Sequence, residues 1–138
     1  MKKIGLFAGI IGVVIGSFLL LSKPASSPQV NKEPTAKLSF ATVSNEAAKK
    51  SATLLDVRSS EEYASGHFAS AVNLDVENIR AGKLPDSAKT QPLYVYCRSG
   101  NRSAQATELL KAAGYTAVTD LGGLDDVKAM GGTLITAP

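Results

Sequence analysis

The stretch from Leu93 to Lys111 constrains the fold of this 138-residue chain more than any other, because it joins an apolar run, a polar loop and a helical pattern. Residues 93–97 read as a buried strand that ends at Cys97, the only cysteine of the sequence. A glycine-containing loop follows, and then a helix is expected over 103–113, ended by Gly114. The pattern predicts a strand, a tight loop and a helix, with the thiol at the end of the strand.

This arrangement predicts an anion-binding loop. Backbone N–H groups point inward in such a loop, and the helix N-terminus adds partial positive charge. Arg98 and Arg102 add full charges. A thiol in that field ionises more readily than a free cysteine, whose pKa is about 8.5, because the field stabilises the thiolate. We predict Cys97 as the catalytic nucleophile and these substrate-binding residues: Arg98, Ser99, Gly100, Asn101, Arg102 and Ser103.

The two arginines are expected to differ. Arg102 is the fifth residue after Cys97 and the last before the expected helix, so we expect it to face the bound anion. The side chain of Arg98 points either toward substrate or toward bulk water. A buried structural thiol is the alternative role for Cys97, but its polar neighbours favour a reactive one.

From about Phe40 onward, five motifs occur in the order in which one family has them. They are Leu54-Leu55-Asp56-Val57-Arg58, Glu61-Glu62-Tyr63, Gly66-His67-Phe68 with the Ala69 to Leu74 run, the cysteine loop, and Leu121-Gly122-Gly123-Leu124. In these motifs the chain resembles a single rhodanese (sulfurtransferase) domain. The resemblance implies an α/β fold with a central, mostly parallel sheet and helices on both faces. It also implies a structural role for His67, in its Gly-His turn.

The resemblance implies sulfur transfer. A Cys97 thiolate would attack the outer sulfur of thiosulfate or a polysulfide, and the resulting persulfide would pass its sulfur to cyanide, a small thiol or a partner's cysteine. The alternative is a membrane-tethered module that binds or carries sulfane sulfur with little turnover. No cofactor is expected. One histidine and one cysteine leave a structural zinc site without ligands, so no metal is predicted.

A cysteine-dependent phosphatase or arsenate reductase is the weaker reading. Phosphatase loops of this kind follow a Cys-x5-Arg pattern, whereas here the sixth residue after Cys97 is Ser103 and the arginine stands one position earlier. In the rhodanese family the shorter ring of N–H groups fits a cysteine-bound sulfur atom. Tyr96, not a histidine, precedes the cysteine.

The N-terminal segment is predicted to direct the chain to a membrane. Residues 4–21 carry no charge, and such a run is about 27 Å long as a helix, close to the thickness of a bilayer core. We expect residues 1–22 to be an anchor or, alternatively, a removed signal, 23–37 a linker and 38–138 the domain. Lys2 and Lys3 would stay cytoplasmic, which places the domain on the extracytoplasmic (periplasmic) side, anchored or released by cleavage.

The net charge of +3 is concentrated near the N-terminus. Five lysines stand against one glutamate before Leu38, which leaves ten basic and eleven acidic residues in the remainder. The domain is therefore nearly neutral and has no basic stripe, and we predict no nucleic-acid partner.

Strand and helix signals alternate through the domain, which favours a parallel sheet covered by helices. The expected strands are 37–40, 53–57, 71–74, 93–97 and 117–121. The expected helices are 45–50 with Ser44 as N-cap, 60–63 with Ser60 as cap, 76–81, 103–113 and 125–130. Asp56 and Arg58 are predicted to form a structural ion pair with each other or with Glu61 or Glu62. Gly122-Gly123 and Gly131-Gly132 are expected in tight turns of positive φ.

Overall fold

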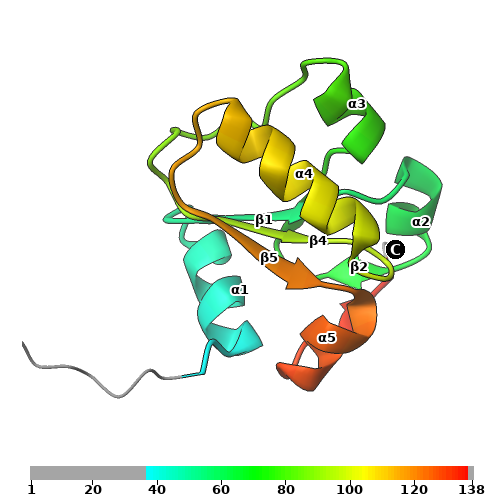
Figure 1. Cartoon of the computed structure of the whole chain (residues 1–138). Helices are drawn as coiled ribbons and strands as arrows, with labels where there is room; N and C mark the ends of the chain where they lie inside the picture. Colours follow the sequence, from blue (N-terminus) through cyan, green and yellow to red (C-terminus); the bar gives the residue numbers. More distant parts are fainter. Residues whose placement is uncertain (1–36, 137–138) are drawn as a thin grey trace, which may run out of the picture. The chain divides into compact units, whose positions relative to one another are not determined.

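A parallel sheet of four strands forms the centre of the domain in the computed structural model, which describes residues 37–136. The strand order is β3-β1-β4-β5. The strands are β1 (Thr53–Asp56), β3 (Ala71–Asn73), β4 (Leu93–Tyr96) and β5 (Val118–Gly122). Helices α1 (Phe40–Ala48) and α5 (Leu124–Ala129) cover one face, and α3 (Val76–Arg80) and α4 (Asn101–Ala112) cover the other (Figure 1). The predicted fold class is confirmed.

Two short elements complete the domain. Helix α2 (Ser60–Ala64) follows β1, and β2 (His67–Phe68) pairs antiparallel with β6 (Leu134–Ile135). Sequence reasoning missed β2 and β6, because two-residue strands are too short to show an alternating pattern.

Alternation along the central strands separates two cores. Leu54, Tyr94 and Tyr96 pack on the α1 and α5 side, whereas Leu55, Val95 and the following Cys97 pack on the α3 and α4 side. Each large apolar side chain buried in this way contributes roughly 1.5–3 kcal/mol. Because successive side chains of a strand alternate between the two faces of the sheet, the Cys97 thiol lies on the face covered by α4.

The start of the domain differs from the prediction. Residues 37–40 form no strand; Phe40 begins α1, and Ser39 is its N-cap, with Oγ accepting a hydrogen bond from the Thr42 N–H at 3.3 Å. Ser44 therefore lies inside the helix. The helix was predicted too short because Phe40 and Val43, three residues apart, are both buried by one face of α1, and an isolated apolar pair carries little periodic signal.

Most other predicted bounds are correct to within one or two residues. Helix α4 begins at Asn101, two residues before the predicted 103, and α2 is capped by Ser59 instead of Ser60. Gly122 and Gly131 have positive φ, at +84° and +99°, as predicted, but Gly123 has φ −91°. Gly132 also lacks a positive φ and is close-packed instead, because a Cβ there would lie 2.9 Å from a ring carbon of Phe68.

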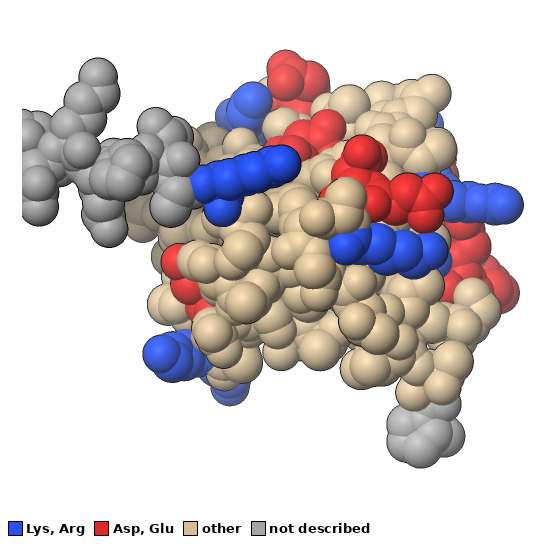
Figure 2. Space-filling model, turned by 90° about the horizontal axis from the view of Figure 1, so that it is seen from below, with Lys and Arg blue, Asp and Glu red and all other residues tan. Residues whose placement is uncertain are grey.

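The predicted membrane segment, over residues 1–22, lies outside the described residues, as does the linker up to residue 36. Within 37–136, no helix is long and apolar enough to cross a membrane. On the α1 and α5 side, Lys and Arg side chains lie beside Asp and Glu, around a broad uncharged area (Figure 2). Residues 37–136 hold no group of three or more metal-binding side chains.

Candidate active site

Cys97 follows β4 directly, at the carboxyl end of a central strand between β1 and β5. Its N–H donates to the Gly122 carbonyl at 3.0 Å, so the backbone is still held to β5 at this point. The chain then turns through Arg98, Ser99 and Gly100 into α4. Ligands of parallel α/β sheets bind beyond the carboxyl ends of the strands, so this is the expected place for a site.

The loop directs an amide at the thiol. Gly100 donates its N–H to Cys97 Sγ at 3.0 Å, and Gly100 has φ +92°, a left-handed conformation that glycine adopts without strain. The buried Ser103 hydroxyl closes the loop by donating to the Gly100 carbonyl at 2.9 Å. The predicted inward-facing amide is therefore present at the sulfur.

The Cys97 thiol contacts the apolar core on one side and the polar loop on the other. Cys97 has no exposed surface and packs with Val95 and Ala106 in the core beneath α4. Burial raises the pKa of Cys97, but hydrogen bonding by the amides of Ser103, Ser99 and Gly100, together with the Ser103 hydroxyl, outweighs burial and lowers the pKa below its ordinary value. The single hydroxyl proton of Ser103 is directed at Gly100 O, so we assign most of this lowering to the backbone amides. The site therefore favours a thiolate.

The turn between β5 and α5 supports the outside of the loop. Leu124 donates its N–H to the Arg98 carbonyl at 3.1 Å, and Ser99 forms an isolated antiparallel bridge with Gly123. A Cβ on Gly123 would lie 2.8 Å from the Arg98 oxygen and 3.0 Å from Ser99 Cα. Gly123 is thus required for close approach, which the Leu121-Gly122-Gly123-Leu124 motif alone did not reveal.

Arg102 lies elsewhere than predicted. It is the second residue of α4 and not the last residue before it, and its guanidinium donates to both carboxylate oxygens of Glu62, at 2.6 Å and 2.9 Å. Both side chains are about one-third exposed, at 33% and 29%. Sequence reasoning missed Glu62 as part of the site. Its local signal is a capping box with Ser59, the residue directly after Arg58.

The remaining residues of the loop are more open. Arg98, Ser99 and Asn101 are exposed, and within the described residues the Arg98 side chain makes no hydrogen bond or ion pair. Their assignment to substrate binding stays a prediction.

Asp56 and Arg58 form the predicted ion pair with each other, Nη2 to Oδ2 2.5 Å, and both are buried. Arg58 also donates to the Gly66 carbonyl at 2.7 Å, so the pair ties the end of β1 to the turn before β2. His67 places Nδ1 at 3.1 Å from the Tyr63 carbonyl and stacks on the Tyr63 ring. These contacts are structural.

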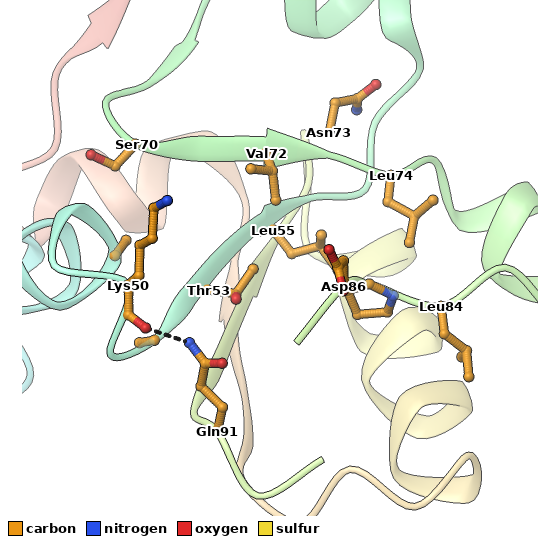
Figure 3. A pocket seen from close by; sticks show the side chains of 13 residues that line it. Lys50, Thr53, Leu55, Ser70, Val72, Asn73, Leu74, Leu84, Asp86 and Gln91 are labelled. Carbon is orange, nitrogen blue, oxygen red and sulfur yellow. Dashed lines mark hydrogen bonds between the residues drawn. The ribbon is translucent and has the colours of Figure 1, made fainter. Parts of the chain in front are cut away.

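A separate cavity of about 630 Å³ lies beside the edge strand β3 and does not include the cysteine loop. Figure 3 shows its lining from β3, the start of β1 and the segment around Leu84 and Asp86, with Gln91 hydrogen bonded to the Lys50 carbonyl at 3.0 Å.

Known proteins resemble this chain over part of its length. The sequence model of the Rhodanese-like domain matches residues 39–130. The Thiosulfate sulfurtransferase PspE of Escherichia coli (strain K12) is 38% identical over 76 residues, which cover 53% of this chain and 71% of that protein. The human Thiosulfate:glutathione sulfurtransferase is 33% identical over 85 residues, covering 52% and 74% of the two chains. A solved structure, a rhodanese with anions from E. coli, is 35% identical, has a TM-score of 0.51, and covers 62% of this chain and 98% of that one.

Proposed function

The chain belongs to the rhodanese-like domain family, and from this premise we propose that it is a sulfurtransferase that moves sulfane sulfur from thiosulfate or polysulfide to a thiophilic acceptor through a Cys97 persulfide. The Escherichia coli relative is named as a thiosulfate sulfurtransferase, and the human relative as a thiosulfate:glutathione sulfurtransferase. The observation that carries the proposal is the Gly100 N–H on Cys97 Sγ, 3.0 Å away, because an amide so placed favours a thiolate and then a persulfide anion.

The first step forms one S–S bond and breaks another. The Cys97 thiolate attacks the outer sulfur of thiosulfate, and sulfite leaves with the bonding electron pair, so that the enzyme retains the persulfide anion. The loop amides of Ser99, Gly100 and Ser103 are the donors available to that anion. A thiolate that its loop already stabilises needs no general base.

The second step returns the thiolate. Cyanide or a thiolate acceptor attacks the terminal sulfur of the persulfide, and Cys97 leaves as the thiolate. Arg98, Ser99 and Asn101 are exposed around the thiol, and we propose that they meet the donor and the acceptor. Arg102, which is paired with Glu62, adds only part of its positive charge. The human relative is named for thiosulfate and glutathione, which supports a small-thiol acceptor here.

The test is a donor panel on the soluble domain, residues 37–138, with thiosulfate, polysulfide and a phosphate ester as donors and cyanide as acceptor. We expect thiocyanate from the sulfur donors and no phosphate release. Cys97→Ser removes the sulfur nucleophile and is expected to abolish turnover. Unchanged turnover in that variant would refute the proposal.

A sulfur carrier with little turnover is the second candidate, and the full burial of Cys97 favours it because a buried persulfide is protected from acceptors. Intact-mass measurement after thiosulfate treatment separates the two. A +32 Da adduct, the mass of one sulfur atom, that persists when cyanide is added indicates storage. Loss of the adduct with formation of thiocyanate indicates an enzyme.

We also propose that residues 4–21 hold the domain at a membrane, on its extracytoplasmic side. The uncharged run of eighteen residues after two lysines supports this. The alternative is a domain released after cleavage. Fractionation of the full chain, followed by protease treatment of intact cells, distinguishes a membrane-bound from a released domain.

A further inference from the structure

Glu62 and Arg102 form the one ion pair in the described part of the chain that includes a residue of the cysteine loop. The contact is bidentate, with Arg102 Nη1 to Glu62 Oε2 at 2.6 Å and Nη2 to Oε1 at 2.9 Å. Bidentate arginine–carboxylate geometry fixes both groups more firmly than a single contact. Arg102 is therefore held at the rim of the loop and is not free to turn fully to an anion.

Glu62 is fixed from its other side as well. Its Oε2 accepts the Ser59 N–H at 3.1 Å, while Ser59 Oγ accepts the Glu62 N–H at 3.3 Å, so the carboxylate belongs to the capping box of α2. Hydrogen bonds from Arg102 lower the pKa of Glu62 to about 2. The carboxylate is consequently ionised at every pH at which the thiol reacts.

The charges around this pair include the thiol itself. Glu62 interacts electrostatically with Arg102 and, more weakly, with Arg58, whereas Arg102 interacts with Glu62, with Cys97 and with Asp75. Arg58 is neutralised by its own buried carboxylate partner. Arg102 is therefore the main positive charge near Cys97 on the α2 side of the loop, and Glu62 determines how much of that charge acts on an anion bound at Cys97.

We propose that Glu62 is a specificity-determining residue, which cancels most of the Arg102 charge and so limits the affinity of the cysteine loop for dianions. With the Arg102 charge largely cancelled, the loop amides become the main groups that attract an anion. These amides hydrogen bond to one sulfur atom, Cys97 Sγ. This inference rests on the proposed function, in which sulfite is the dianionic product. Weaker attraction of dianions releases sulfite more readily, and sulfate and phosphate then compete less with the sulfur donor.

The probe is the rate of Cys97 alkylation by iodoacetate divided by the rate by iodoacetamide. Both reagents attack the thiolate, so the ratio cancels changes in thiol pKa and in access, and it reports how strongly the site attracts a negative reagent. The measurement requires no sulfur transfer. Its failure is thus separable from failure of the proposed function, which the donor panel tests.

Glu62→Gln keeps the side-chain shape and removes the charge. We expect the ratio to rise about three- to tenfold, the effect of one unit charge at a partly exposed site. Arg102→Gln should lower it by a similar factor. The double variant, in which neither charge remains, should return to within about twofold of the unsubstituted protein.

Two controls separate charge from structure. Ser59→Ala removes the cap and leaves the Glu62 charge, and Glu61→Gln removes an exposed charge from the same turn. Neither should change the ratio more than about twofold, and thermal melting confirms that each variant is folded. An unchanged or lower ratio in Glu62→Gln, or a double variant as low as Arg102→Gln, would overturn the proposal.

Discussion

The Gly100 amide nitrogen lies 3.0 Å from Cys97 Sγ, and the two residues are three positions apart in one loop. The Gly100 N–H that stabilises the thiolate therefore belongs to the same loop as Cys97, and no residue distant in the sequence is required for this contact. Its geometry depends on the positive φ of Gly100 and on the Ser103 hydroxyl that closes the turn.

The pKa of Cys97 is lowered, because hydrogen bonds in the loop outweigh its burial, and this predicts a pH profile. Only the thiolate is alkylated, so the rate rises as the pH passes through the pKa. We expect the midpoint for iodoacetamide in the folded protein to lie below that of the same protein unfolded in urea. Ser103→Ala loosens the loop and should move the folded midpoint upward. Equal midpoints in the folded and unfolded protein would contradict the assignment.

Gly123→Ala should damage the site more than the fold. The added Cβ would lie 2.8 Å from the Arg98 carbonyl and so displace the cysteine loop. We expect activity to fall at least about tenfold and stability to fall by about 1–3 kcal/mol, the usual cost of overpacking. Gly131→Ala is the matched control, because its Cβ meets nothing within 4 Å although φ is +99°. It should cost stability and leave activity within about twofold.

Asp56→Asn should be strongly destabilising. It leaves the Arg58 guanidinium buried without its carboxylate, and breaking a buried pair in this way costs about 3–5 kcal/mol. Urea unfolding measures the loss. Replacing both partners, with Asp56→Asn and Arg58→Met, should be less costly than the single change, because no uncompensated charge remains. A double variant less stable than Asp56→Asn would show that Arg58 acts mainly through its contact with Gly66.

Glu62 should contribute stability that depends on pH. Hydrogen bonds from Arg102 lower its pKa from 4.5 to about 2, so the folded state binds the proton less readily than the unfolded state. The contribution is therefore complete above about pH 4.5 and is lost as the pH falls toward 2. Urea unfolding should show a difference between the unsubstituted protein and Glu62→Gln that is constant from pH 7 to pH 5 and shrinks below it. A pH-independent difference would exclude this linkage.

Much of the fold followed from local patterns. Apolar runs such as Leu93–Tyr96, separated by helical patterns, are enough to predict a parallel sheet, because strands buried on both faces need no long-range information to be found. The position of the thiol site could be predicted from the same run, because a cysteine after a buried strand and before a helix lies at the carboxyl end of the sheet, where ligands bind. Predictions failed where the signal was short, as at Phe40 in α1 and at His67–Phe68 in β2.

The sequence by itself determined that a lone cysteine stands at the end of a buried strand, in a loop one residue shorter than a phosphatase loop, and that Asp56 and Arg58 are close enough in the chain to pair. The tertiary structure alone decided which groups surround that loop. Glu62 lies forty residues from Arg102, and Gly123 twenty-four residues from Ser99, so neither contact has a periodic signature. Such pairs meet only because parallel strands bring their carboxyl ends to one edge of the sheet, where segments distant in the chain converge on the same thiol.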